Sequence, residues 1–269
     1  MSLSSWTGGS GENTHHDNQL NEDCYIRYFD FRLVATLDKR QVSEVSKVYP
    51  QYKILHCLTG SEIMEVLKLM VSWLHDHSGE VVILDFQHFF KFSLLDHTRL
   101  VNMLVTLFGD LLCPWKPDLS SLTLTQMVTA GTRVIIVYPA LFSSQFRSEE
   151  TSRSWTHLMY FWPRSLCPNP WADTMDPDYL ESFLTDGLAS HRSSGRRTLF
   201  VSQGVLTPSW RTVLRHPLSG IRRSCACASE DAVTRWLGGD QDQPNIVMTD
   251  FVSDAVVNQV VDRNMMCTK

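Results

Sequence analysis

The chain has 269 residues, 43% of them hydrophobic, and a formal net charge of −5 at pH 7. This composition is typical of a folded globular protein and excludes general disorder. The negative charge gives no reason to expect a nucleic-acid partner, because binding to phosphate backbones favours a basic face. The apolar runs at 81–84 and 134–137 have strand length, so we expect no transmembrane segment.

Residues 1–18 are polar and have no apolar periodicity, so we interpret them as a disordered or irregular lead-in to one domain at 19–269. The lead-in has neither the basic start nor the apolar core of a secretory signal, and Ser2 stands where N-myristoylation needs Gly. The seven cysteines are scattered, and Cys225 and Cys227 are too closely spaced for a usual zinc knuckle. We therefore expect reduced thiols in a cytoplasmic protein.

From residue 25 onward, strand-like and helix-like segments alternate. Residues 26–33 alternate in period two and are rich in aromatics, which predicts a strand, and 53–56 predict a shorter one. Ser61 is the predicted cap of an amphipathic helix that runs to His77. Residues 81–87 are almost uniformly apolar before their end, which is typical of a parallel strand covered on both faces.

The second half continues the same alternation. Helices are predicted at 94–108, 122–129 and 177–189, and strands at 133–138, 197–202 and 245–250. Residues 143–176 are rich in Trp, Pro and Ser and predict a long excursion with one short strand near 158–162.

This alternation favours parallel strands joined by right-handed crossovers, in either a doubly wound sheet or a closed barrel. Polar residues gather at the strand ends: Asp30, Arg32, His56, Asp85 to His88, Ser202, Gln203, Thr249 and Asp250. Functional groups at the carboxyl ends of many strands are the arrangement of a (β/α)8 barrel. No GxGxxG or Walker-type loop follows a strand, which weakens the nucleotide-binding alternative.

Four of these residues are candidates for a site. Asp30 and Arg32 lie two apart on a strand, so their side chains face the same side. Because buried charges are costly unless they are paired or functional, the two residues form either an internal salt bridge or part of a functional site. His56 ends the next strand, where it is either a satisfied polar group or an acid–base catalyst. Asp250 ends the last strand, where it either caps a turn or acts in the site.

Two further histidines are weaker candidates. His88, in DFQHFF, is a further candidate with weaker support. His16, in THHD, lies in the polar lead-in and is interpreted as solvated.

An ordered series of blocks carries a resemblance to a known family. The blocks are IRYFDFRL, a strand ending in His, EVVILDFQHFF, LFGDLLCP, PWADTMDP, FVSQGVLTP and NIVMTDFV. Over residues 19–264 the series resembles the phosphatidylinositol-specific phospholipase C (PI-PLC) X domain-containing proteins. The resemblance implies a distorted TIM barrel, which in this chain lacks its first strand.

The resemblance also implies a phosphoric diester hydrolase. In the family, the inositol 2-hydroxyl attacks the neighbouring phosphorus, which releases diacylglycerol and forms a cyclic phosphodiester that is then hydrolysed. The reaction needs a base, an acid and positive charge at the phosphate oxygens. By position in the motifs, His56 is similar to the general acid, Arg32 to the cation over the phosphate and Asp30 to a carboxylate of the same site. Asp250 is similar to the acid that orients the first histidine.

Two positions bear on metal use. Calcium-dependent relatives carry an acidic residue at the position of Arg32 and Glu at that of Gln87, and calcium prefers several carboxylate oxygens. A guanidinium in place of the metal suits this sequence better. We therefore predict no cofactor and no calcium requirement.

One family motif has no counterpart. The family places its first histidine in a Gly-Ser-His-Asp motif at the end of the first strand, whereas Gly9-Ser10 is followed here by Gly-Glu. His16 and Asp17 are the nearest substitute, but no apolar strand precedes them and no helix fits after them. An alternative start, a splice form or an incomplete gene sequence is the favoured explanation. Cys57 also stands where the family usually has Gly.

Three functions therefore stay open. The first is the phosphodiesterase, and the second is a catalytically inactive X domain that retains a lipid-headgroup pocket or a partner surface. The third is a barrel phosphodiesterase for glycerophosphodiesters, which needs a metal-binding carboxylate set that the sequence does not supply.

The expected partner is phosphatidylinositol or a related phospholipid at a membrane surface. We expect a cytoplasmic protein of lipid metabolism and signal transduction with peripheral membrane contact. Trp155, Trp162 and Trp171 are candidate anchors at headgroup depth, although Trp is equally at home in a core.

Overall fold

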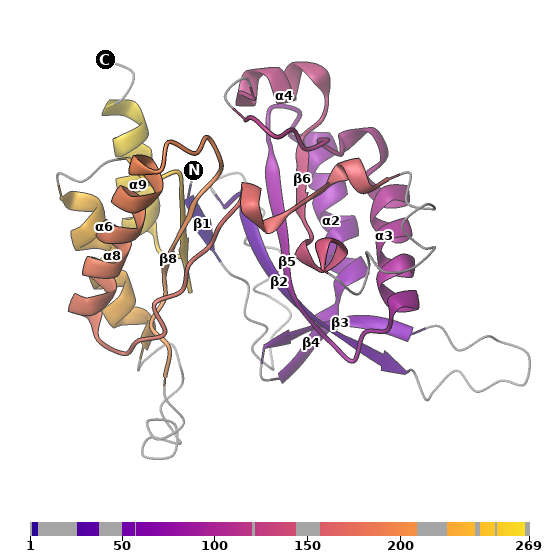
Figure 1. Cartoon of the computed structure of the whole chain (residues 1–269), viewed down its shortest axis with the longest axis horizontal. Coiled ribbons are helices and arrows are strands. Elements are labelled where there is room, and N and C mark those ends of the chain that lie inside the picture. The colour runs from indigo at the N-terminus through magenta and orange to yellow at the C-terminus, as the bar shows by residue number, and fades with distance from the viewer. Residues whose placement is uncertain are drawn as a thin grey trace, which may run out of the picture.

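The computed structural model describes residues 2–4, 26–37, 50–56, 58–119, 122–143, 157–208, 225–239, 243–250 and 252–266. Their strands form two sheets, one ordered β1-β9-β8 and the other β4-β3-β2-β5-β6-β7 (Figure 1). The strands are β1 (Ser2–Ser4), β2 (Tyr28–Leu37), β3 (Pro50–His56), β4 (Leu58–Glu62), β5 (Val82–Phe90), β6 (Val134–Val137), β7 (Phe161–Trp162), β8 (Val201–Gly204) and β9 (Ile246–Thr249). The α-helices are α2 (Ile63–Asp76), α3 (Leu94–Phe108), α4 (Leu124–Ala130), α6 (Pro177–Ser193), α8 (Cys227–Gly238) and α9 (Asp254–Met266).

The two sheets face each other across a shared interior and carry helices on their outer sides. In Figure 1, α6, α8 and α9 lie outside the three-stranded sheet, and α2 and α3 lie outside the six-stranded sheet. Side chains from both sheets meet in one buried cluster that includes Tyr28, Ile83, Val201 and Met248. Strand β8 is also tied to the segment that follows β7, where the N–H of Val201 donates to the carbonyl of Pro168 at 2.9 Å. The alternating pattern therefore forms a distorted barrel with a filled interior.

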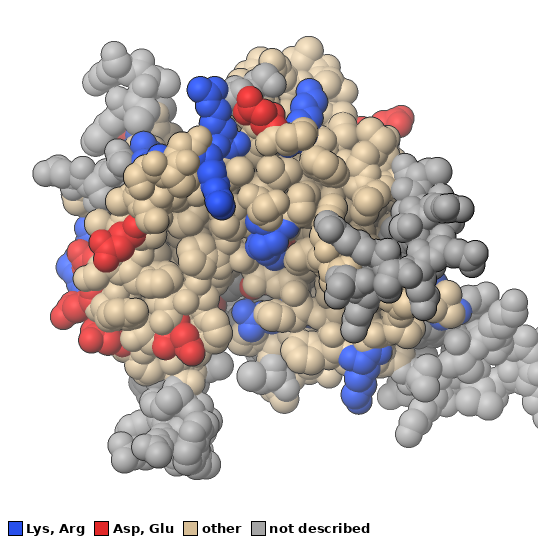
Figure 2. Space-filling view, in the orientation of Figure 1, with Lys and Arg blue, Asp and Glu red and all other residues tan. Residues whose placement is uncertain are grey.

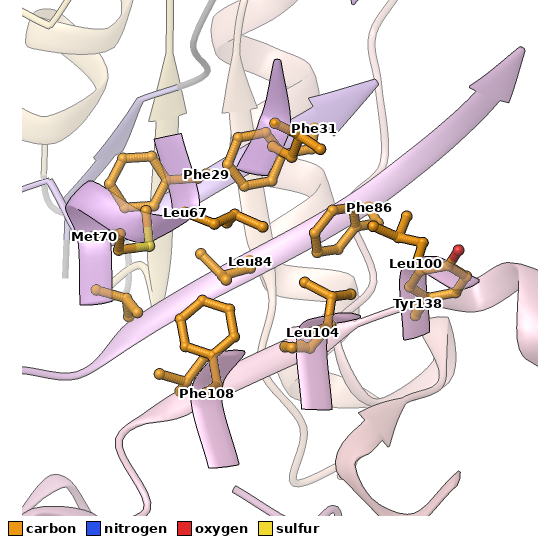
Figure 3. Packing of buried hydrophobic residues seen from close by; sticks show 14 of the residues in the cluster. Phe29, Phe31, Leu67, Met70, Leu84, Phe86, Leu100, Leu104, Phe108 and Tyr138 are labelled. Carbon is orange, nitrogen blue, oxygen red and sulfur yellow. The ribbon is translucent and has the colours of Figure 1, made fainter. Parts of the chain in front are cut away.

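A second buried cluster, the outer core, holds α2 and α3 against β2 and β5 (Figure 3). Its members follow the two periods of the sequence, because every second residue of a strand and every third or fourth residue of a helix faces it. Each large apolar side chain buried there contributes about 1.5–3 kcal/mol. The labelled members are Phe29, Phe31, Leu67, Met70, Leu84, Phe86, Leu100, Leu104, Phe108 and Tyr138.

The expectation of parallel pairing throughout is wrong for β2, β3 and β4. Strand β2 continues past residue 33 to Leu37, and β3 returns antiparallel along this extension, from Leu37 opposite Pro50 to Leu33 opposite Ile54. Strand β4 then pairs antiparallel with β3. A direct reversal of this kind needs no crossover helix. The pairs β2–β5, β5–β6, β6–β7, β8–β9 and β1–β9 are parallel, as predicted.

The lead-in is not irregular at its start. Ser2–Ser4 form β1, which pairs parallel with β9, Ser2 lying opposite Val247 and Ser4 opposite Thr249. A first barrel strand would cover this edge of β9. The prediction that the first strand is missing is therefore corrected for Ser2–Ser4, which cover the edge over three residue pairs. The edge of β9 would otherwise present unpaired backbone groups. The predicted boundary between residues 18 and 19 lies outside the described residues and stays a prediction.

The helix boundaries confirm most of the sequence predictions. Helix α3 spans Leu94–Phe108 as predicted, begins at a capping box of Ser93 and Asp96, and ends at Gly109, whose φ of +48° favours glycine. The predicted cap of α2 is wrong, because Ser61 belongs to β4 and the cap is Glu62. Within the described residues, none of the helices combines the length and hydropathy needed to cross a bilayer.

Candidate active site

The four candidates named from the sequence line one cavity. Asp30 and Arg32 come from β2, His56 from the end of β3, and Asp250 directly follows β9. The cavity has a volume of about 250 Å³, and its walls come from both sheets. Residues that are 220 positions apart in the sequence (30 to 250) therefore meet at the mouth of the barrel, which the strand-end pattern predicted.

Asp30 and Arg32, whose spacing predicted a shared face, form an ion pair. Arg32 Nη2 lies 3.6 Å from Asp30 Oδ2, and the two side chains are 37% and 4% exposed. Burial raises the pKa of Asp30 to about 7, although the charge of Arg32 opposes this shift. Among the described residues, Asp30 Oδ1 and Arg32 Nε are buried and have no hydrogen-bond partner. The pair therefore retains unused donor and acceptor capacity beside the cavity.

His56 is half-buried in the same cavity. Burial lowers its pKa, the positive charge of Arg32 lowers it further, and the carboxylate of Asp250 raises it. The imidazole thus lies within electrostatic reach of both a cation and a carboxylate. This environment suits a group that exchanges protons near neutral pH.

A buried polar network lies below the cavity, in the barrel interior. Asp85 is fully buried and accepts hydrogen bonds from both terminal nitrogens of Arg164, each at 2.6 Å, and from the hydroxyl of Tyr28 at 2.5 Å. Burial raises the pKa of Asp85, and the hydrogen bonds from Arg164 act in the opposite direction. Asn169 donates to Asp85 at 3.3 Å, and its carbonyl accepts from Gln203, which lines the cavity.

Sequence reasoning missed the role of Arg164. Asp85 is one of the polar strand ends of the sequence, but it is not among the four predicted site residues. Arg164 lies in the excursion between β7 and α6, for which the sequence predicts only a short strand. The available signal was chemical, because a buried carboxylate in the run VVILDF needs a cation or several donors. Only the fold identifies Arg164 as that cation.

The remaining predicted residues have different outcomes. Trp162 is fully buried, and its Nε1 donates to the carbonyl of Cys113 at 2.9 Å, so of its two alternatives, membrane anchor or core residue, the structure shows the core residue. Trp171 is 52% exposed and lines the cavity. His16, Asp17, Cys57 and Trp155 lie outside the described residues.

Charge is unevenly distributed over the face in Figure 2. Acidic side chains gather over the helices at the left, α6 and α8, whereas basic side chains lie along the boundary between the left and right parts of this face. A net charge of −5 therefore does not describe the surface locally.

Comparison with known proteins identifies the family. No family model matches the chain. The chain is 31% identical over 230 residues to PI-PLC X domain-containing protein 3 of Danio rerio, a match that covers 84% of this chain and 64% of that protein. It is 30% identical over 241 residues to PI-PLC X domain-containing protein 1 of Danio rerio, covering 87% of this chain and 68% of that protein. The chain belongs to the PI-PLC X domain-containing protein family.

Solved structures support the fold of this family member. The chain superposes on the phosphatidylinositol-specific phospholipase C of Listeria monocytogenes with a TM-score of 0.52 at 14% identity, over 89% of this chain and 78% of that one. The predicted distorted TIM barrel is thereby confirmed. The chain spans about 64% of the length of the first of these relatives.

Proposed function

We propose that this chain is a phosphodiesterase of the phospholipase C type that cleaves phosphatidylinositol or a related phosphoinositide. The proposal rests on one observation above all, the convergence of Asp30, Arg32, His56 and Asp250 on one cavity at the barrel mouth. Cleavage releases diacylglycerol and a cyclic inositol phosphate, which is then hydrolysed. The chain spans about 64% of the length of its first relative, so we propose the activity and the substrate for this chain and not for the whole relative.

Each residue has a chemical role in this proposal. The imidazolium of His56 donates a proton to the leaving alkoxide of diacylglycerol, and Arg32 stabilises the negative charge on the phosphate oxygens. Asp30 holds the guanidinium from one side, at 3.6 Å, and leaves the other nitrogens of Arg32 for the phosphate. Asp250 favours the protonated form of His56, because its carboxylate acts against burial and the charge of Arg32, which lower the pKa of that imidazole.

The same arrangement makes a calcium requirement unnecessary. Calcium would supply positive charge at the phosphate and would need several oxygen ligands. Here Arg32 supplies that charge, and the neutral amide of Gln87 donates to Asp85 at 3.4 Å. We therefore propose that the reaction proceeds without a metal cofactor.

Membrane contact follows from the substrate, which lies in a bilayer. Three large apolar side chains near the mouth are exposed: Trp171 at 52%, Leu58 at 57% and Phe90 at 46%. Leu58 follows His56 by two residues, and Trp171 lines the cavity itself. We propose that these side chains enter the headgroup region when the cavity receives a lipid headgroup.

The test is release of inositol phosphate from phosphatidylinositol vesicles in EDTA, with this chain and with His56→Ala. We expect activity that His56→Ala lowers 10²–10⁴-fold, since removal of a general acid or base has effects of this size. Activity that appears only after calcium is added would disprove the metal-free mechanism. Equal background signals from both proteins, with vesicle binding retained, would support the inactive headgroup-binding form.

A further inference from the structure

We propose that His88 is the second imidazole of this site and the general base for the hydroxyl that attacks phosphorus. The inference rests on the proposed phosphodiesterase function and completes it. Phosphodiester cleavage by this route needs a base as well as an acid, and the roles of His56, Arg32, Asp30 and Asp250 leave the base unassigned. His88 lies near the carboxyl end of β5, and its side chain is exposed.

A β-bulge at the end of β5 controls the direction of His88. In the β2–β5 ladder, Phe31 lies opposite Phe86, but the next residue of β2, Arg32, lies opposite His88. Gln87 is therefore the extra residue on β5. A bulge of this kind interrupts the regular alternation of side chains and re-aims those that follow it.

The packing on the other face shows the effect of the bulge. Phe86 belongs to the outer core, and Phe89, three residues later, also packs against it. In a regular strand, residues three apart point to opposite faces. Because Phe86 and Phe89 share the outer face, the bulge has returned Phe89 to that side. His88, like its ladder partner Arg32, therefore faces the barrel mouth.

Arg32 is carried by the strand that lies between those of the two imidazoles. Strands β3 and β5 flank β2 on either side, and neighbouring strands are about 4.8 Å apart. The charge of Arg32 lowers the pKa of His56 and also that of His88, so both rings lie within its electrostatic reach. A phosphate held by Arg32 would thus have one imidazole on each side, which is the placement that in-line displacement requires.

The charged groups around His88 favour the neutral form of its ring. Burial, Arg32 and Arg164 lower its pKa, and Asp85 on its own strand raises it. The ring is consequently neutral at pH 7, and a neutral imidazole accepts a proton. Burial and Arg32 lower the pKa of His56 as well, and the carboxylate of Asp250 raises it.

The proton balance of the reaction follows. His88 takes the proton of the inositol 2-hydroxyl as that oxygen bonds to phosphorus. The bond from phosphorus to the diacylglycerol oxygen breaks, and this oxygen takes the proton of the His56 imidazolium. In hydrolysis of the cyclic product, neutral His56 takes a proton from water, and the His88 imidazolium returns its proton to the inositol 2-oxygen.

Two substrates separate the base from the acid. The first is phosphatidylinositol in vesicles, and the second is the 4-nitrophenyl phosphodiester of inositol, whose leaving group departs without a proton. We expect His88→Ala to lower turnover 10²–10⁴-fold on both substrates, because the attacking hydroxyl is the same. His56→Ala should lose much less on the nitrophenyl ester than on the lipid. His75→Ala, which removes an exposed imidazole on α2, is the matched control and should leave both rates unchanged.

The outcomes distinguish this inference from the proposed function. If His88→Ala matches the unmodified chain while His56→Ala is impaired, the function stands and the base is wrong. If His88→Ala is impaired on the lipid alone, His88 acts on the leaving group, which also overturns the assignment. A loss of activity that tracks a lower urea midpoint would indicate a structural role instead. If the unmodified chain cleaves neither substrate, the function and the base fail together.

Discussion

The two faces of strand β2 differ as much as any two surfaces of this molecule. Phe29, Phe31 and Leu33 point outward and are buried in the outer core against α2 and α3. Asp30 and Arg32, interleaved with them, point inward to the cavity. The alternation of a β-strand thus separates stabilisation from chemistry by one residue.

The difference shows where this fold tolerates the cost of burying charged groups. The outward face satisfies simple rules, because its side chains are apolar, large and well packed. The inward face breaks them, since Asp30 is 5% exposed and one of its oxygens has no hydrogen-bond partner among the described residues. Buried charged groups that lack hydrogen-bond partners are expected where a bound ligand supplies those partners.

The largest effect should come from the outward face. Phe31→Ala removes a side chain that is 1% exposed and stacks with Phe29, so we expect the free energy of unfolding to fall by about 3–5 kcal/mol. Urea unfolding measures this change. Phe31→Leu is the control and should lose much less, and equal losses from both variants would contradict a packed outer core.

On the inward face, Arg32→Ala should damage activity more than stability. We expect a 10²–10³-fold loss of turnover, the usual effect of removing one donor to a developing oxyanion, which corresponds to about 2.7–4 kcal/mol. Because the Arg32 side chain is 37% exposed, the urea midpoint should change little. Arg32→Lys keeps the charge but loses the planar fork, so an intermediate rate is expected. Full activity of Arg32→Ala would remove the cation from the mechanism.

Asp30 should make stability fall as pH rises. Its pKa is raised from 3.8 to about 7 in the folded chain, so between these values the folded state binds more protons than the unfolded state. Relative to Asp30→Asn, the unmodified chain should therefore lose a few kcal/mol of unfolding free energy between pH 4 and pH 7. Parallel urea titrations across this range measure the difference, and a pH-independent difference would contradict the buried carboxyl.

His97, at the outer core, should have a smaller effect of opposite sign. Burial lowers its pKa from 6.5 to about 4, and its Nδ1 lies 2.8 Å from the hydroxyl of Tyr138. Its stabilising contribution is present above pH 6.5 and is lost as pH falls toward 4, because the unfolded state then binds the extra proton. His97→Asn keeps a polar atom near Tyr138 and should remove this slope. If the slope survives the substitution, another group causes it.

The outward face was largely predictable. The period-two pattern of residues 26–33 and the helical spacing at 94–108 predicted β2 and α3, because each pattern leaves one apolar face that must be covered. The same reasoning failed for β3, which was expected to be parallel to its neighbours. Pairing direction depends on where the chain reverses, and the composition of a strand carries little information about that.

The site was predictable in its members but not in its geometry. The sequence by itself determined that Asp30 and Arg32 share a face, that His56 and Asp250 end strands, and that an ordered series of motifs belongs to one family. These features are local, since they follow from spacing along the chain. The tertiary structure decided that the four residues line one cavity, that Arg164 neutralises Asp85 from 79 positions away, and that a bulge turns His88 toward Arg32. Such contacts join distant segments, and only closure of the barrel brings those segments together.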